Sequence, residues 1–198
     1  MPFILRWPGV VKPASIDSMH FISFADIMPT ILDITNIAKP GKINGRSMLP
    51  ILKGNNQTNR EYAFTEFSEA GGYAFHPEHI AYPMRAVQNK DYIFIINYWA
   101  DGERSFKGGW NPYTSTRYII EEIAFNNDKE LLNRYMFFLH RTPEEFYDLK
   151  KDPECLNNLA NEPNYVSQKE IFRKILIDQM KKTGDPALKP TLIGTPDA

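Results

Sequence analysis

Residues 82–97 read YPMRAVQNKDYIFIIN, and this stretch decides how the residues around it fold. Two largely apolar runs, Pro83–Gln88 and Tyr92–Asn97, flank the polar residues 89–91, an arrangement that predicts an antiparallel hairpin. The second run begins with five consecutive apolar residues, so both faces of that strand are apolar. A strand with two apolar faces is covered on both sides, which predicts a central place in its sheet.

Further strands and helices are predicted on either side of this hairpin. Tyr62–Phe67 and Glu145–Leu149 have the character of strands, and a helix is expected within residues 116–139. The clearest helix lies near the C-terminus, because apolar residues recur there at helical spacing and charged residues fill the other positions. Its apolar stripe consists of Ile171, Phe172, Ile175, Leu176 and Met180. The predicted fold class of this lobe is α+β, with a small antiparallel sheet packed against the C-terminal helix.

Two starting points are open for the C-terminal helix. Ser167 and Glu170 have the spacing of a capping box, whereas Pro163 suits the first turn of a helix that begins earlier. Gly184 and Pro186 are predicted to end the helix, because glycine accepts a left-handed cap and proline cannot continue a helix.

The first 60 residues have a different pattern. Residues 2–6 predict a buried strand that ends at a Pro-Gly turn. Residues 23–38 carry apolar side chains at helical spacing, and Ser23 and Asp26 are placed to satisfy or complement the first amides of that helix.

A polar stretch separates the two lobes. Residues 47–52 predict a short helix closed by Gly54, and the residues after it are polar and aperiodic up to about residue 60. The predicted organisation is therefore a first lobe at 1–60, a second lobe at 61–188 and a loose tail at 189–198.

Composition and charge exclude several classes of protein. The chain has 198 residues, of which 42% are hydrophobic, and a formal net charge of −1. A nearly neutral chain lacks the basic face of a nucleic-acid-binding protein, so no nucleic acid partner is predicted. Cys155 is the only cysteine, which excludes an intrachain disulfide. No stretch approaches the roughly 18 apolar residues of a membrane span, and none is predicted.

Four motifs, in order along nearly the whole chain, resemble the sulfatase family of the alkaline-phosphatase-like superfamily. They are PFILRWPGVV at 2–11, DIMPTILD at 26–33, GRSMLPILKG at 45–54, and EFYDL at 145–149 followed by DP at 152–153 and NLA at 158–160. YPMRAV at 82–87 and TGDP at 183–186 are most similar to the heparan N-sulfatase group. The resemblance implies that residues 1–60 are an edge portion of an α/β alkaline-phosphatase-like domain and that residues 61–188 are a C-terminal sulfatase subdomain.

The resemblance also implies hydrolysis of sulfate esters or N-sulfates. Such enzymes use a formylglycine, made from cysteine in a C-x-P-S-R or C-x-A-x-R motif, and Ca²⁺ held by several Asp with an Asn or Gln. Cys155 lies in the run ECLNN and has neither motif, so it is interpreted as a partly buried structural thiol. We therefore expect no catalytic residue, metal ligand or cofactor in this chain, and we expect it to be a fragment or a truncated reading frame.

Four polar residues are candidates for substrate binding by the same resemblance. His76, Glu78, His79 and Arg85 could contact a sulfated sugar, and arginine suits a pair of anionic oxygens. In the alternative interpretation the His and Glu side chains are solvated and Arg85 pairs a carboxylate within the sheet. A metal site at His76 and His79 is disfavoured, because Pro77 between them opposes a helix that would align both rings.

Aromatic residues are a second group of candidates. Trp99, Trp110 and Tyr113 could be platforms for sugar rings, or they could fill the core or a dimer interface. Trp110 is the one predicted to bind substrate, because its surroundings have the composition of an accessible loop.

Three functions remain open at this stage. The first is the C-terminal portion of a glycan sulfatase, whose sulfated substrate is bound together with a domain upstream and which could form a homodimer. The second is a non-catalytic module for sulfated-glycan binding or dimerisation, and the third is part of a phosphonate or phosphate ester hydrolase. The family resemblance implies a periplasmic, extracellular or lysosomal location.

Overall fold

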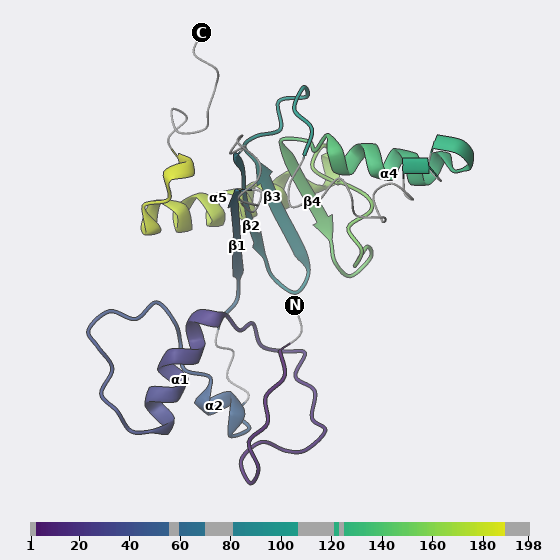
Figure 1. The fold of residues 1–198 in the computed structure, drawn as a ribbon. Helices are drawn as coiled ribbons and strands as arrows, with labels where there is room; N and C mark the ends of the chain where they lie inside the picture. Colours follow the sequence, from purple (N-terminus) through teal and green to yellow (C-terminus); the bar gives the residue numbers. More distant parts are fainter. Residues whose placement is uncertain (1–2, 56–59, 70–80, 107–120, 123–124, 189–198) are drawn as a thin grey trace, which may run out of the picture. The chain divides into compact units, whose positions relative to one another are not determined.

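The computed structural model describes residues 3–55, 60–69, 81–106, 121–122 and 125–188. The chain divides into two compact units, Met1–Ala63 and Phe64–Ala198. Figure 1 colours the first unit from purple to blue and the second from teal to yellow.

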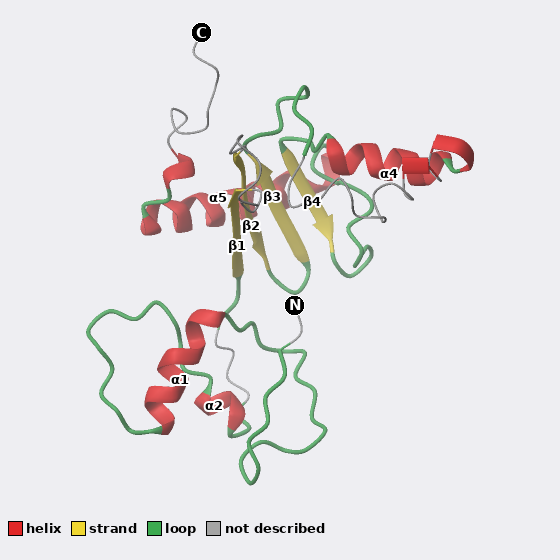
Figure 2. Ribbon diagram, viewed as in Figure 1, coloured by secondary structure: helices red, strands yellow, loops and turns green. Residues whose placement is uncertain are grey.

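A four-stranded sheet organises the second unit, and its strands follow the chain order β1-β2-β3-β4. The strands are β1 (Ala63–Glu69), β2 (Ala81–Gln88), β3 (Tyr92–Asn97) and β4 (Glu144–Asp148), drawn in yellow in Figure 2. β3 pairs antiparallel with β2 on one side and with β4 on the other. Both the predicted hairpin and the predicted central place of its second strand are therefore confirmed.

The turn of the hairpin is built around Asn89. Its side-chain Oδ1 accepts hydrogen bonds from the amides of Asp91 and Tyr92, each at 2.8 Å, and its own amide donates to the carbonyl of Tyr92 at 3.0 Å. Asparagine favours turns because its side chain can hydrogen-bond to the backbone of the following residues. The polar residues 89–91 thus set the register of the two apolar runs.

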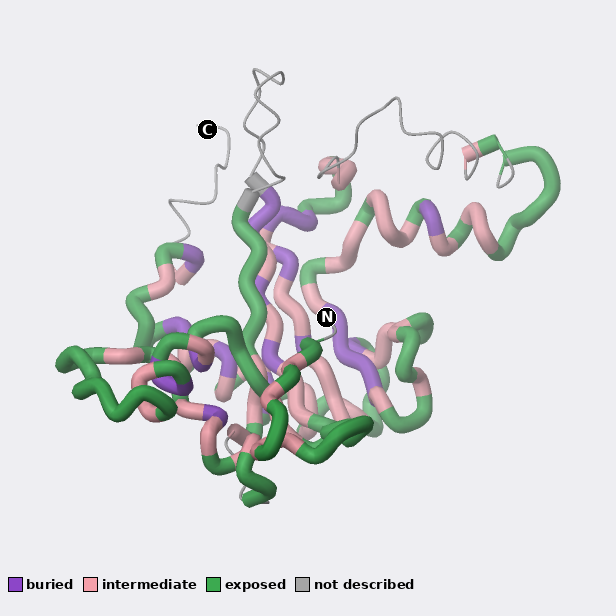
Figure 3. The backbone as a smooth tube through the Cα atoms, turned by 60° about the horizontal axis from the view of Figure 1, so that its bottom comes forward, coloured by how far each residue is buried: buried purple, intermediate pink, exposed green. Residues whose placement is uncertain are grey.

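The helix α5 (Val166–Thr183) covers one face of the sheet (Figure 1). Phe172 is 1% exposed, and its ring lies 5.7 Å from that of Phe146 in β4 and 6.0 Å from that of Tyr92 in β3. Phe146 and Tyr92 stack on each other at 5.3 Å and 11°. Together with the buried Leu176 and Met180, these rings form the core between sheet and helix. Figure 3 colours the buried stretches of the backbone purple.

The ends of α5 test the predicted caps. A 3₁₀ turn, η2 (Pro163–Tyr165), leads into the helix, and no side chain caps α5 itself. The earlier start at Pro163 is therefore confirmed, and the capping box at Ser167 and Glu170 is wrong, because both residues lie inside the helix. Gly184 ends the helix in the left-handed conformation with φ 68°, as predicted. The stripe is wrong at Ile171, which is 51% exposed because it lies at the edge of the packed face.

The helix expected within residues 116–139 is also present. α4 (Lys129–Leu139) begins at Asp128, whose carboxylate accepts hydrogen bonds from the amides of Glu130 and Leu131 at 3.0 Å each. The amide of Phe106 donates to the carbonyl of Leu139 at 2.7 Å and so connects the residues after β3 with the end of α4. Of the helices in the described part of the chain, none is both long enough and apolar enough to span a bilayer.

The first unit contains η1 (Phe24–Asp26), α1 (Ile27–Ile34) and the short α2 (Leu49–Leu52). Ser23 and Asp26 form a capping box at the start of η1, which confirms their predicted role. α1 ends four residues before the predicted limit, and Gly54 follows α2 with φ 87°.

The strand predicted at residues 2–6 is wrong for the part that the structure describes. Residues 3–7 have no regular secondary structure, and Phe3 and Ile4 are 43% and 92% exposed. A strand needs a neighbour for its amides and carbonyls, and no described segment supplies one. The turn after it is present, since the amides of Val10 and Val11 donate to the carbonyl of Trp7 at 3.2 Å and 3.0 Å.

The packing of α5 leads to a first prediction. Replacing Phe172 by alanine removes a fully packed ring, so we expect the free energy of unfolding to fall by about 3–5 kcal/mol. The matched change Ile171→Ala, one position along the same helix, removes a half-exposed side chain and should cost less than about 1 kcal/mol. Urea denaturation followed by circular dichroism measures both values. Equal losses in the two variants would contradict the packing of α5 on the sheet.

Candidate functional site

The residues predicted to bind substrate fall into two groups. His76, Glu78, His79 and Trp110 lie outside the residues that the structure describes, as does Tyr113. Arg85 lies in β2 and is described in full.

Arg85 is buried, with 5% of its surface exposed, and its guanidinium binds Asp185 in the turn after α5. Nε donates to Asp185 Oδ2 at 2.6 Å and Nη2 donates to Oδ1 at 2.9 Å. Nη1 donates to the backbone carbonyls of Phe67 at 3.0 Å and Met84 at 2.8 Å. We call these four residues the Arg85 cluster. It joins β1, the middle of β2 and the turn after α5 at one point.

The chemistry of the Arg85 cluster is that of a buried ion pair. Two parallel hydrogen bonds between a guanidinium and a carboxylate are the strongest form of this pair. The hydrogen bonds from Arg85 lower the pKa of Asp185, and the same bonds raise the pKa of Arg85. The partner carboxylate lies beyond the sheet rather than within it, and every nitrogen of the guanidinium has a protein acceptor. Contact of Arg85 with a sugar stays a prediction.

An aromatic cluster joins the start of β2 to the residues that follow β3. The ring of Tyr82 lies 5.1 Å from that of Trp99 at 87°, and 4.9 Å from that of Phe106. The hydroxyl of Tyr82 donates to the carbonyl of Ser105 at 3.1 Å. Of the two interpretations left open for Trp99, the core residue is confirmed, because its side chain is 1% exposed.

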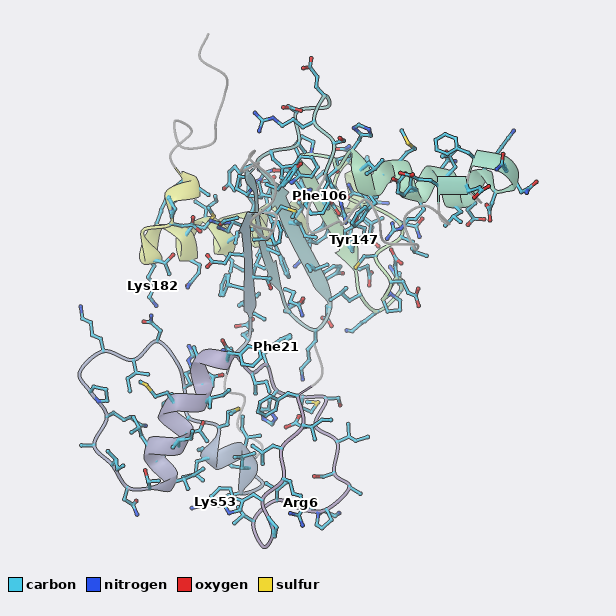
Figure 4. All side chains as sticks on the ribbon, viewed as in Figure 1. Arg6, Phe21, Lys53, Phe106, Tyr147 and Lys182 are labelled. Carbon is cyan, nitrogen blue, oxygen red and sulfur yellow. The ribbon has the colours of Figure 1, made fainter. Side chains whose placement is uncertain are left out.

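A second polar cluster surrounds Glu145 in β4, which is 1% exposed. Its carboxylate accepts hydrogen bonds from Asn97 Nδ2 at 2.7 Å, from Arg141 Nη1 at 2.9 Å and from the Tyr147 hydroxyl at 2.6 Å. Burial raises the pKa of Tyr147 far above its ordinary value, and the bond to Glu145 adds to this, so the phenol stays protonated and donates. Figure 4 labels Tyr147, from this Glu145 cluster, and Phe106, from the aromatic cluster.

Sequence reasoning did not single out Asn97, Arg141 or Glu145. Two polar residues in apolar surroundings could have indicated this cluster. An Asn ends an otherwise apolar strand, and a Glu begins the EFYDL motif. Asn97 Oδ1 and Trp99 Nε1 are buried and have no hydrogen-bond partner among the described residues. Buried polar atoms are normally paired, so these two atoms are exceptions at the end of β3.

A third cluster holds the first unit together around Asp26, which is fully buried. Its carboxylate accepts hydrogen bonds from the amide of Ser23 at 2.8 Å, the amide of Arg46 at 2.8 Å and Nη2 of Arg60 at 2.6 Å. Thr30 donates to the carbonyl of Asp26 at 2.5 Å and accepts from the amide of Met48 at 2.8 Å. The motifs DIMPTILD and GRSMLPILKG are thus bonded to each other.

Cys155 does not have the surroundings of a reactive thiol. Burial raises its pKa first, and the carboxylates of Asp152 and Glu145 raise it further, whereas a nucleophilic cysteine needs a lowered pKa. Within the described ranges no group of three or more His, Cys, Asp or Glu side chains could hold a metal ion. The described residues therefore do not fit a Ca²⁺ site.

Comparison with known proteins gives the family. Residues 1–106 match the family described as N-sulphoglucosamine sulphohydrolase, C-terminal. The chain belongs to this family of sulfatases. The match includes Asp26, Thr30 and Gly45 of the first unit and the whole β2–β3 hairpin of the second.

Two curated relatives of this sulfatase chain cover nearly all of it. An ulvan-active sulfatase of Formosa agariphila is 31% identical over 99% of the chain and 36% of its own length. The human N-sulphoglucosamine sulphohydrolase is 25% identical over 92% of the chain and 39% of its own length. The chain therefore spans little more than a third of the length of these relatives.

A solved structure supports the fold of the sulfatase chain. The phosphonate monoester hydrolase of Agrobacterium radiobacter superposes with a TM-score of 0.51 at 18% identity, over 82% of this chain and 25% of its own. At this identity the likeness shows the fold alone. It confirms the predicted α+β fold class, a small antiparallel sheet packed against a C-terminal helix.

The ion pair in the Arg85 cluster predicts how stability depends on pH. Because the pKa of Asp185 is lowered in the folded state, its stabilising contribution is present above the ordinary pKa of 3.8 and is lost as the pH falls through the folded value. We expect the unfolding free energy of the wild type to fall more steeply than that of Asp185→Asn between about pH 5 and pH 2. At neutral pH, Asp185→Asn should cost about 3–5 kcal/mol, because it leaves Arg85 buried without a charged partner.

The control for this prediction is Asp178→Asn, an exposed aspartate on α5. Urea denaturation at a series of pH values measures all three proteins. If Asp185→Asn had the same pH dependence as the wild type, the proposed contribution of the ion pair would be wrong.

Proposed function

We propose that this chain is the C-terminal region of a sulfatase that removes sulfate from glycans, as sulfate esters or N-sulfates. The observation that carries the proposal is the match of residues 1–106 to the C-terminal family of N-sulphoglucosamine sulphohydrolases. The catalytic groups, a formylglycine and the ligands of Ca²⁺, would come from residues outside this chain. The surroundings of Cys155 support this, because the sequence around it lacks the required motif and the pKa of its thiol is raised.

The role proposed for the second unit is to form a wall of the substrate pocket. β2 begins directly after the segment that contains His76, Glu78 and His79, which we propose as contacts for the sulfated sugar together with Trp110. The Arg85 cluster would fix the start of this wall, since it holds β1, β2 and the turn after α5 together. Arg85 would therefore act on the substrate through the backbone that it positions.

The substrate class is proposed from the relatives. One is named for activity on ulvan and the other for N-sulphoglucosamine, so a sulfated glycan is the chemistry that they share. We propose the heparan type with N-sulfate as the first candidate, because the YPMRAV and TGDP runs are most similar to that group. An exported or lysosomal location would follow from the same proposal.

A second candidate function has one observation in its favour. The phosphonate monoester hydrolase has the same fold, so this region could equally serve the hydrolysis of a phosphonate ester. The curated relatives favour sulfate, since both are sulfatases and each aligns with more than nine-tenths of the chain. A non-catalytic glycan-binding or dimerisation module is the third option.

The first test of the proposal compares two forms of the protein. The purified 198-residue chain should release no sulfate from N-sulfoglucosamine or from a sulfated polysaccharide above the uncatalysed rate, because its one cysteine does not lie in a formylglycine motif. The native gene product, captured from its source cells with an antibody to this chain, should release sulfate and should be larger than 22.9 kDa. Ion chromatography of free sulfate and an immunoblot are the measurements. Sulfate release by the isolated chain would show that the catalytic groups lie within it.

The same captured product separates sulfate from phosphonate chemistry. We expect its kcat/KM for a sulfate ester to exceed that for the matched phosphonate monoester by at least about a hundredfold, which is the effect of roughly 2.7 kcal/mol of transition-state stabilisation. The opposite preference would favour the second candidate function. A native product of 22.9 kDa that binds a heparin oligosaccharide without releasing sulfate would favour the third.

A further inference from the structure

Asn44 stands directly before Gly45, and no other asparagine of the sequence precedes a glycine. Both residues lie in the segment between α1 and α2, outside any helix or strand, and Asn44 is exposed (Figure 1). No residue in the described part of the chain accepts a hydrogen bond from the amide of Gly45. An exposed side-chain amide therefore lies next to a backbone nitrogen that no side chain of its own residue shields.

Asn36 is the natural comparison, because it is an exposed asparagine of the same unit. It precedes Ile37, whose branched side chain crowds the backbone amide. That amide is also occupied, since it donates to the carbonyl of Leu32 at 2.9 Å. The backbone nitrogen after Asn36 is thus both shielded and bonded.

Asp101 is the second comparison, because it precedes a glycine, Gly102. Its Oδ1 accepts hydrogen bonds from the amides of Arg104 at 2.8 Å and Glu103 at 2.9 Å. These bonds lower the pKa of Asp101, so its carboxyl group stays ionised. An ionised carboxylate resists attack by a neighbouring nitrogen, whereas the neutral side-chain amide of Asn44 does not.

The chemistry open to Asn44 is deamidation through a cyclic imide. The Gly45 nitrogen attacks the side-chain carbonyl carbon of Asn44, and the new N–C bond closes a five-membered succinimide. The side-chain nitrogen leaves as ammonia and carries away the proton of the Gly45 amide. Water then opens the ring on either side. Cleavage at the side-chain carbonyl gives aspartate, and cleavage at the main-chain carbonyl gives isoaspartate, whose main chain runs through the former side chain.

The backbone after Asn44 has no room for such a change. Gly45 lies so close to η1 that a Cβ there would be 1.8 Å from the carbonyl oxygen of Ala25. The next amide, that of Arg46, donates to Asp26 Oδ1 at 2.8 Å. Isoaspartate adds an atom to the main chain directly before these two contacts. A displaced Arg46 amide would leave the fully buried carboxylate of Asp26 without one of its donors.

We propose that Asn44 is a site of spontaneous covalent modification, and that its isoaspartate product opens the cluster of hydrogen bonds around Asp26. The first unit would then carry a chemical limit on the lifetime of its fold. The aspartate product retains an ordinary main chain and leaves that cluster intact.

Incubation of the full 198-residue chain in warm, mildly alkaline buffer tests the site. Isoaspartate is labelled by an isoaspartyl methyltransferase with labelled S-adenosylmethionine, and peptide mass spectrometry locates it. We expect label at position 44 to accumulate at least about tenfold faster than at Asn36 or Asp101. The variant Asn44→Gln should gain no label at this position, because its longer side chain would have to close a larger ring.

Hydrogen exchange of the Arg46 amide tests the consequence, after chromatography has separated the isoaspartate form from the unmodified chain. We expect exchange at Arg46 to be at least about tenfold faster in the isoaspartate form. The variant Asn44→Asp gains the negative charge without the longer main chain, so its Arg46 amide should exchange as in the wild type. The amide of Asn97 in the second unit, which donates to the carbonyl of Pro143 at 2.8 Å, should be unchanged in every form.

Two kinds of result would overturn the proposal. Equal labelling at position 44 and at Asn36 or Asp101 would show that the neighbouring glycine and its amide do not select Asn44. Isoaspartate that leaves exchange at Arg46 unchanged would show that the longer main chain does not open the cluster around Asp26. Exchange in Asn44→Asp as fast as in the isoaspartate form would assign the effect to charge and would contradict the proposal as well.

Discussion

The packing of Phe172 against Phe146 and Tyr92 is the contact on which the second unit depends. It places α5 on one face of the sheet, and because side chains alternate along β4, it leaves the neighbours of Phe146 on the other face. Glu145 and Tyr147 therefore meet Asn97 on the face away from α5. The same contact fixes the position in space of the C-terminal end of α5. The turn after α5 therefore lies next to β2. The ion pair of Arg85 with Asp185 and the Glu145 cluster are both consequences of where this one helix lies.

Burial accounts for acidic residues in three of the sequence motifs, DIMPTILD, EFYDL and TGDP. Three buried carboxylates of the motifs receive donors from other segments: Asp26 from the neighbouring motif, Glu145 from β3 and from Arg141 after α4, and Asp185 from β2. A buried charge without such partners costs several kcal/mol, so each acidic residue specifies the position of the segment that satisfies it. These acidic residues thus position the segments that donate hydrogen bonds to them. A structural role is enough to explain why they are acidic.

Local patterns predicted the features that local physics determines. The hairpin at residues 82–97 and the capping box at Ser23 follow from turn chemistry and from spacing, and both are present. The start of α5 was undecided from the sequence, because Pro163 and Ser167 each offer a valid local solution and only the packed helix selects between them. The predicted strand at residues 2–6 lacked the partner on which any strand depends. The partner of Arg85 lies 100 residues away in sequence, so no local pattern could show that its guanidinium is already occupied.

The fold of this chain does not by itself define a substrate. A phosphonate monoester hydrolase has the same arrangement at 18% identity, so the sheet and helix do not select between a sulfate and a phosphonate ester. Selection requires side chains that touch the substrate, and the described core directs its polar groups inward, to Asp185, Glu145 and Asp26. The residues proposed to contact the substrate, His76, Glu78, His79 and Trp110, stand in the sequence between the strands. A scaffold fixed by buried charges, with substrate contacts confined to its connecting segments, would allow one fold to serve sulfatases of different glycans.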